Sequence, residues 1–126
     1  MSGFIYLDIE EVLFIHGDQL RLAGGAQGVR DMGILESALF RPQTGYYPDL
    51  IAEASALWES LAMNHPFIDG NKRVAIAATF TFLYGNGTRV TAQDDDTWKF
   101  VLGSLEAGGF NFDVIDTWLR ANTAPR

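Results

Sequence analysis

The sequence predicts an all-α protein, a compact single-domain bundle of about six helices that spans residues 1–126. Apolar residues recur at three- and four-residue spacing along several segments, which is the period of an amphipathic helix. Aspartates stand directly before several of these segments, where they can accept hydrogen bonds from free backbone amides. The run Val74–Leu83 contains neither a charge nor a helix breaker, so we expect a central helix from about Asn71 to Tyr84, with the others packed around it.

Composition limits the classes of protein to consider. With 126 residues, 48% hydrophobic and 20% charged, the chain is typical of one globular domain. The absence of cysteine excludes disulfides and thiolate metal sites. A net charge of −7 repels a phosphate backbone, which argues against general nucleic-acid binding. No apolar run reaches the roughly 20 residues of a membrane span, and the N-terminus does not resemble a signal peptide, so we expect a cytoplasmic protein without a membrane contact.

The six helices are predicted in chain order from their caps, apolar stripes and breakers. Asp8, Asp31 and Asp49 are each expected to cap a helix, and Pro66 ends the third helix at about Asn64. The run Asp94–Asp96 is expected to form the cap and first turn of the fifth helix rather than a cation site. An apolar stripe is expected on that helix at Trp98, Val101, Leu102 and Leu105. The expected helices cover residues 8–19, 32–40, 49–64, 71–84, 94–105 and 114–119.

Two side chains and one loop have both a structural and a functional interpretation. His16 falls on the apolar face of the first helix, and a core histidine that hydrogen-bonds a neighbour is favoured there over a ligand role. Trp58 lies in the buried stripe of the third helix and is expected to anchor the core rather than to stack on a ligand. The glycines of Leu22–Arg30 lack the spacing of a dinucleotide fingerprint, which favours a flexible connection.

The segment His65–Arg73, His-Pro-Phe-Ile-Asp-Gly-Asn-Lys-Arg, concentrates the chemistry of the chain. It places an imidazole, a carboxylate, an amide and two adjacent cations directly before the central helix. A helix N-terminus presents free amides and the positive end of the helix dipole. The positive charges of Lys72 and Arg73 in the first turn are unfavourable beside the positive end of the dipole. A bound phosphate would make the electrostatic energy of these cations favourable. Two adjacent cations are most often a solvated pair, but their place after Asp-Gly-Asn at a helix start favours phosphate binding.

The other residues of this segment each have two interpretations. His65 either closes the third helix or takes a proton from an attacking hydroxyl. Asp69 either caps the turn or holds Mg²⁺ that bridges nucleotide phosphates, or it helps to orient His65. Gly70 either lets the backbone approach a phosphate or only permits a positive φ, and Asn71 either caps the helix, donates to phosphate, or does both. Phe67 is expected to pin the loop to the core in either case.

The same segment resembles the signature of the Fic/Doc family, specifically its Doc-like branch. The signature is His-x-Phe-x-(Asp/Asn)-(Gly/Ala)-Asn-Lys-Arg. The chain matches it at His65, Phe67, Asp69, Gly70, Asn71, Lys72 and Arg73. Lys72 stands where the motif of the adenylyltransferases in this family has its second glycine. A second and independent resemblance runs from Val29-Arg30-Asp31 through Leu35–Leu39 to Arg41-Pro42-Gln43.

The resemblance implies a Fic fold and transfer from ATP, with Mg²⁺, to a hydroxyl of a protein. It gives His65 the role of base, Asp69 the catalytic and metal role, and residues 70–73 the contacts to the nucleotide. Lys72 implies the Doc-like arrangement, in which the nucleotide is reversed and the γ-phosphate moves to a Ser or Thr. The family then implies a toxin that phosphorylates elongation factor Tu and arrests translation. AMP transfer by the same residues, or a non-catalytic binding module, are the alternatives.

The resemblance also implies an inhibitor and a target-binding segment. The family's self-inhibiting motif, (Ser/Thr)-x-x-x-Glu-(Gly/Asn), is absent, so inhibition is expected in trans from a small antitoxin that lays a helix beside the site. The resemblance implies that the loop Arg41–Pro48 forms a flap beside the site that holds the target in an extended pose, and it leaves open whether Gln43–Tyr47 contacts the target. Met63 stands where some Doc-like chains have an arginine, which removes one possible phosphate contact.

Overall fold

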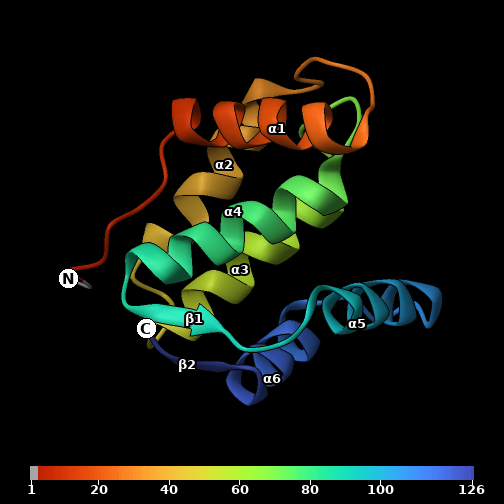
Figure 1. The fold of residues 1–126 in the computed structure, drawn as a ribbon. Helices are drawn as coiled ribbons and strands as arrows, with labels where there is room; N and C mark the ends of the chain where they lie inside the picture. Colours follow the sequence, from red (N-terminus) through yellow and green to blue (C-terminus); the bar gives the residue numbers. More distant parts are fainter. Residues whose placement is uncertain (1–2) are drawn as a thin grey trace.

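The computed structural model describes residues 3–126, which form six α-helices, one turn of 3-10 helix and two short strands (Figure 1). The elements are α1 (Ile9–Ala23), α2 (Met32–Phe40), η1 (Arg41–Gln43), α3 (Leu50–Met63), α4 (Asn71–Gly85), β1 (Thr88–Val90), α5 (Asp94–Glu106), α6 (Phe112–Ala121) and β2 (Thr123–Pro125). The predicted all-α class and its six helices are confirmed. Within residues 3–126 no helix is both long and apolar enough to cross a membrane.

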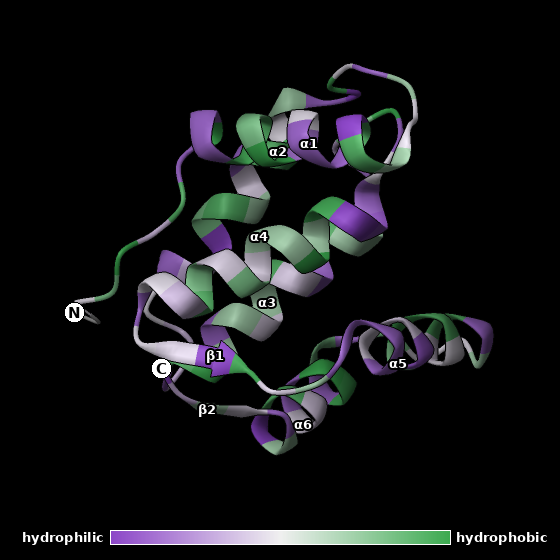
Figure 2. Cartoon of the chain, in the orientation of Figure 1, coloured by the Kyte–Doolittle hydropathy of each residue, from purple (hydrophilic) through white to green (hydrophobic). Residues whose placement is uncertain are grey.

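Helices α3 and α4 form the centre of the molecule, with α1 and α2 on one side and α6 on the other (Figure 1). The central position predicted for α4 is shared with α3, which is the more enclosed of the two. Ten of the 14 residues of α3 are buried, against seven of the 15 in α4. The small residues of α3 let neighbours approach from several sides, whereas α4 keeps Lys72, Thr81 and Tyr84 exposed. Figure 2 shows a hydrophilic turn at the start of α4, followed by less polar turns.

Trp58 anchors the core, as predicted, where α3 meets the C-terminal half of the chain. Its side chain is fully buried. Four aromatic rings surround it in edge-to-face contacts, with centroid distances of 5.5–5.9 Å: Phe80, Phe100, Phe110 and Trp118. Such pairs add to the burial of the rings themselves. This cluster joins α5 and α6 to the central pair.

Side-chain caps start most of the helices, and they agree with the sequence in all but one predicted case. Asp8, Asp31 and Asp49 each accept a hydrogen bond from the amide three residues further on, at 2.8–3.0 Å. Helix α5 differs from the prediction, because its N-cap is Gln93 and no side chain caps it. The run Asp94–Asp96 forms only the first turn, where its charges still complement the dipole.

The first helix is longer than predicted, since α1 continues to Ala23 instead of ending at Gln19. The additional residues are good helix formers, and the helix ends only at Gly24, whose φ of 77° suits glycine. The amide of Gly24 donates to the carbonyl of Leu20 at 2.7 Å. The extension matters because it brings the end of α1 to the His65–Arg73 segment.

Two features of the C-terminal third were not predicted. Strands β1 and β2 pair antiparallel and tie the C-terminus to the end of α4, but three residues are too few for a strand pattern to be recognised. In α5, Leu102 is 52% exposed, so its place in the predicted apolar stripe is wrong. The residues of α5 that are buried are Thr97 and Val101. The helix projects beyond α6, so it has a neighbour along only part of its length (Figure 1).

Candidate active site

The loop between α3 and α4 sets the position of His65. After α3 ends at Met63, His65 adopts a φ of 52°, the one positive φ at a non-glycine residue within residues 3–126. Histidine tolerates this left-handed region better than most side chains, and the following Pro66 disfavours the right-handed helical alternative. The imidazole is exposed and forms no hydrogen bond in the described part of the chain, so both ring nitrogens are available to a ligand.

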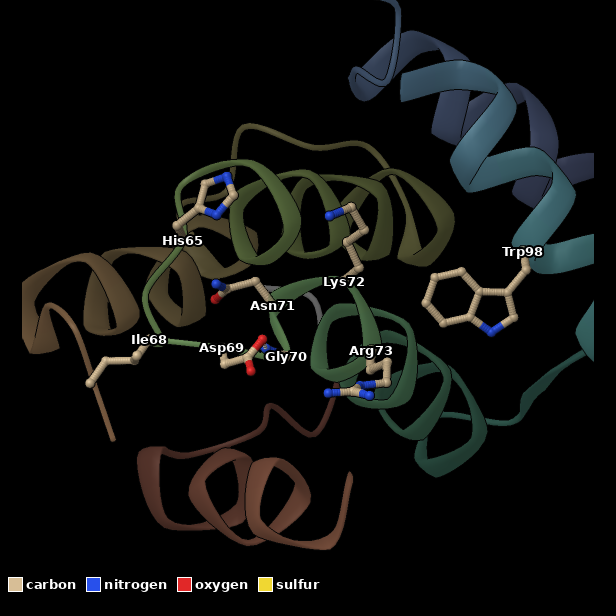
Figure 3. Close-up of a pocket in the computed structure, with 8 residues that line it drawn as sticks. All are labelled: His65, Ile68, Asp69, Gly70, Asn71, Lys72, Arg73 and Trp98. Carbon is tan, nitrogen blue, oxygen red and sulfur yellow. Dashed lines mark hydrogen bonds between the residues drawn. The ribbon is translucent and has the colours of Figure 1, made fainter. Parts of the chain in front are cut away.

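The predicted site residues line one open cleft of about 420 Å³ at the start of α4 (Figure 3). Its walls are His65, Ile68, Asp69, Gly70, Asn71, Lys72, Arg73 and Trp98. The structure therefore brings together every residue that the sequence proposed for the site. Trp98, from α5, is the one wall that lies outside the His65–Arg73 segment. Trp98 was not among the predicted site residues, because its helical spacing assigned it to an apolar stripe.

Phe67 and His16 hold the loop from beneath. Phe67 is fully buried, as predicted, and its ring stacks on the imidazole of His16 in α1, with 3.9 Å between centroids and an interplanar angle of 11°. Nε2 of His16 lies 2.9 Å from the carbonyl oxygen of Asp69. Because a carbonyl only accepts, Nε2 is the protonated nitrogen of this contact. The prediction of a core histidine bonded to a neighbour is confirmed, and that neighbour is the loop itself.

Asn71 closes the turn that precedes α4. Its side-chain oxygen accepts from the Phe67 amide and its side-chain nitrogen donates to the Phe67 carbonyl, both at 3.0 Å. Of the two interpretations of Asn71, the structure contradicts the helix cap, because the N-cap is Gly70, at φ 78°, and no side chain caps α4. Asn71 is instead the first helical residue, and its side-chain amide points back to the loop. One hydrogen of its side-chain nitrogen stays without a partner among the residues described.

The start of α4 is consequently open. The backbone amides of Asn71, Lys72 and Arg73 donate to no group within residues 3–126, and the first bond of this helix runs from the Val74 amide to the Gly70 carbonyl at 2.9 Å. These amides and the positive end of the dipole face the cleft. An anion bound there would satisfy both, which is the arrangement that phosphate sites at helix N-termini use.

The two cations of the first turn have different surroundings. Arg73 donates to the Gly24 carbonyl at 2.9 Å and lies 3.4 Å from that of Ala23, so it neutralises the C-terminal end of α1. This structural role was not predicted. Lys72 is exposed and forms neither an ion pair nor a hydrogen bond in the part of the chain that the structure describes. Lys72 is therefore the cation that is free to meet a ligand.

Asp69 is held as a carboxylate by two backbone amides. Oδ2 accepts from the Ala26 amide at 3.1 Å and Oδ1 from its neighbour Gly70 at 2.8 Å. These bonds, first that of Ala26, lower the pKa of Asp69, and the nearby Arg73 and His16 lower it further. The side chain forms no bond to His65, so the structure gives no support to an orienting role. Asp69 lines the cleft next to Gly70 (Figure 3).

The donor set fits magnesium only in a site that the substrate completes. No group of three or more His, Asp or Glu side chains that could hold a metal occurs among the described residues. Mg²⁺ commonly uses one or two carboxylates together with substrate phosphates and water. Asp69 is exposed, ionised and beside the open start of α4, which meets that requirement.

The segment Gly24–Arg30 is a loop, as predicted, and it is bonded to the loop that carries His65. Val29 pairs with Phe67 in an antiparallel bridge, and the Ile68 amide donates to the Gly28 carbonyl at 3.1 Å. Nε of Arg30 donates to the His65 carbonyl at 2.6 Å. The φ of 118° favours glycine at position 28, where a Cβ would also lie 2.8 Å from Cδ1 of the exposed Ile68 side chain.

The segment predicted as a flap, Arg41–Pro48, contributes no residue to the cleft. It precedes α3 whereas His65 follows α3, and a helix of 14 residues is roughly 21 Å long. Arg41 binds Glu59 and Ser60 at 2.8 and 2.9 Å, which fixes the segment to the body. The prediction that it lies beside the site is wrong. Gly24–Arg30 occupies that place, and the glycines and Arg30 are the sequence signals that could have indicated it.

The fold and the cleft together define a class: an all-α domain in which an uncapped helix start lies beside a histidine and a carboxylate. Comparison with known proteins makes this specific. The model of the Fic/DOC family matches residues 6–83, and the chain belongs to that family. The chain is 47% identical over 95 residues to "Toxin Doc" of Mycolicibacterium smegmatis (strain ATCC 700084 / mc(2)155), which covers 71% of each chain. It is 29% identical over 89 residues to "Protein kinase doc" of Escherichia phage P1, covering 68% of this chain and 71% of the relative. The predicted Doc-like branch is confirmed.

Proposed function

We propose that this chain is a Doc-like toxin that transfers the γ-phosphate of ATP to a Ser or Thr hydroxyl of a protein. The names of its two relatives, a toxin and a protein kinase, support this class. The observation that carries the proposal is the uncapped start of α4. Its free amides and the unpaired Lys72 share one cleft with an exposed His65.

The roles follow from these positions. The amides of residues 71–73 and the Lys72 ammonium bind phosphate oxygens and stabilise the charge that develops on the transferred group. His65 accepts the proton of the attacking hydroxyl, which its lack of any other hydrogen bond leaves it free to do. Asp69, with Asn71 and Gly70 beside it, would hold Mg²⁺, which would supply positive charge to the phosphates of the nucleotide. Arg73 keeps α1 and α4 together and adds positive charge.

Gly24–Arg30 takes the role that the resemblance assigned to the flap. It is already bridged to Phe67 through Val29, so it lies alongside the loop that carries His65. An extended target segment added beside it would bring a hydroxyl to the imidazole by strand-like pairing. Elongation factor Tu is the target that we propose, with arrest of translation in the cytoplasm as the result.

The main alternative is transfer of AMP by the same residues. We favour phosphate transfer because Lys72 replaces the glycine of the adenylyltransferase motif and extends a cation into the cleft. The second alternative, a binding module without catalysis, would not require His65. Both are decided by one experiment.

The purified protein is incubated with Mg²⁺, elongation factor Tu and ATP labelled either at the γ-phosphate or in the adenine. We expect label from the γ position only, and its loss in His65→Ala and Asp69→Asn. Asp113→Asn, an exposed aspartate of α6, is the matched control and should keep activity. Label from adenine only would replace kinase activity with AMP transfer. No label with a folded protein would contradict catalysis on this target.

Inhibition in trans is tested separately. Because the self-inhibiting motif is absent, expression of the toxin alone should stop growth, and co-expression of the small protein encoded beside it should restore growth through a tight complex. Growth arrest that the neighbouring protein neither relieves nor binds would contradict the antitoxin.

A further inference from the structure

Trp98 is an aromatic wall in an otherwise polar cleft. It lies in the second turn of α5, and Figure 3 shows its indole on the far side of Lys72 and Arg73 from His65. The side chain is half-buried. Every other wall of the cleft comes from the segment at the start of α4, so α5 contributes this single residue.

Core packing does not account for this position. The aromatic residues nearby join the Trp58 cluster, in which Phe100 stacks on Trp118 with 4.7 Å between centroids. Trp98 takes part in no ring pair and in no hydrogen bond within residues 3–126. A large ring outside the aromatic core, with a face open to a cleft, is available for a planar ligand.

The charges of the two helices divide the cleft. The start of α4 offers free amides, Lys72 and Arg73, whereas the first turn of α5 carries the three carboxylates of Asp94–Asp96 one turn before Trp98. Phosphates are attracted to the first and repelled by the second, and the single cation of Lys99 does not balance three acids. A ligand with an anionic end and a neutral planar end would therefore place its planar end at α5.

We propose that Trp98 stacks on the purine base of the bound nucleotide, an inference that rests on the proposed function. Bases stack well on aromatic side chains, because each base offers a π-face. His65 and Trp98 lie at opposite ends of the cleft (Figure 3). A base on Trp98 thus puts the phosphate chain between the two residues and its terminal phosphate on the His65 side. Trp98 is then a residue that determines base affinity and the direction of the nucleotide.

The test measures nucleotide binding without any protein target. Wild type, Trp98→Ala, Trp98→Phe and the control Leu102→Ala, an exposed residue of the same helix, are titrated with Mg²⁺–ATP and with inorganic triphosphate in a calorimeter. We expect Trp98→Ala to weaken ATP binding about 10-fold and to leave triphosphate binding unchanged. Trp98→Phe should retain most of the affinity, and the control should match wild type. In transfer assays, the factor by which Trp98→Ala raises KM for ATP should be about 10 times the factor by which it lowers kcat.

Three results would overturn the inference, and they are distinguishable. Equal ATP affinity for wild type and Trp98→Ala removes the stacking role. Equal weakening of ATP and triphosphate by Trp98→Ala shows that the ring only supports the cleft, and a raised KM for the protein target alone moves it to target binding. A wild type that binds neither ATP nor triphosphate would overturn the proposed function itself, and this inference with it.

Discussion

The two central helices begin in opposite ways. Helix α3 starts at Asp49, whose carboxylate caps the Ala52 amide and pairs with Arg120 at 2.9 Å. The Arg120 guanidinium, more than the cap itself, lowers the pKa of Asp49. Helix α4 starts at Gly70, which has no side chain to cap with, and has two cations where acids are favourable. The Asp49 carboxylate satisfies one free amide at the start of α3, whereas no side chain satisfies an amide at the start of α4.

The difference shows how an open helix start is kept in place. The contacts that fix α4 all lie beneath or behind the cleft: Asn71 to the Phe67 backbone, His16 to the Asp69 carbonyl, and Arg73 to the end of α1. None of them occupies the amides themselves. A site that binds an anion needs rigid support that leaves the amides free, and these polar contacts supply the support. At the start of α3, the cap and the ion pair of Asp49 serve stability alone.

The largest expected effect comes from the free cation. Lys72→Ala should lower the rate of phosphate transfer roughly 100-fold, as loss of one charged donor at a transition state commonly does. It should also raise the free energy of unfolding by about 0.3–1 kcal/mol, because a cation that opposes the α4 dipole is removed. Transfer assays and denaturant unfolding measure the two changes. Arg89→Ala, an exposed cation of β1, is the control and should alter neither. A parallel loss of activity and stability would contradict the comparison.

The support beneath the cleft should matter for stability as well as activity. Asn71→Ala leaves the amide and carbonyl of Phe67 without partners in a buried position, which costs about 1–3 kcal/mol. We expect a lower denaturation midpoint together with reduced transfer, in contrast to Lys72→Ala. Asn71→Asp, which keeps an acceptor for the Phe67 amide only, should give an intermediate midpoint. An unchanged midpoint for Asn71→Ala would mean that the turn closes without this side chain.

The capped start should respond in the reverse sense. Asp49→Ala removes the N-cap of α3 and should lower the free energy of unfolding by about 1 kcal/mol, with transfer activity unchanged. Asp49→Asn keeps a capping oxygen and loses the bidentate ion pair with Arg120, which is half-exposed. Its stability should therefore lie between that of Asp49→Ala and that of wild type. A loss of activity in either folded variant would show that α3 is not the purely structural partner of this comparison.

How far the sequence predicts this molecule depends on whether the interaction is local. The caps at Asp8, Asp31 and Asp49 involve an amide three residues away, so composition and spacing reveal them. The cleft was predicted because His65–Arg73 is continuous in the chain and resembles a family signature. The place of His16 in the core also followed, since an apolar face of one helix is a local pattern.

The rest depends on contacts between distant segments, which spacing does not contain. The Ala26 amide meets Asp69 across 43 residues, and Arg30 meets the His65 carbonyl across 35. The flap was therefore assigned to the wrong loop, because both candidate loops have turn residues and only the folded chain shows which lies beside the site. Trp98 was missed for the same reason: helical spacing cannot separate a ring that faces the core from one that faces a cleft. The contact of Asn71 with Phe67 was not predicted either, since the same side-chain amide could cap the helix or close the loop.

The smallest effects concern the carboxylates near the two helix starts, whose pKa values move in opposite directions. The pKa of Asp69 is lowered by the Ala26 and Gly70 amides, so its contribution to stability is present above its ordinary value of about 4 and is lost as pH falls through the lower folded pKa. The stability difference between wild type and Asp69→Asn should stay constant from pH 8 to 5 and shrink only below about pH 4.

Glu53, in the first turn of α3, provides the contrast. Burial raises its pKa, and its hydrogen bond from Tyr6 at 2.8 Å only partly opposes this. A raised carboxyl pKa favours folding of the protonated form, so stability falls as pH rises through the folded value. Glu53→Gln keeps an acceptor for Tyr6 and should stabilise the protein more at pH 7 than at pH 4. Denaturant unfolding of both variants at a series of pH values measures the two trends. Trends of the same sign would contradict the assignment of Asp69 to the ligand and of Glu53 to the core.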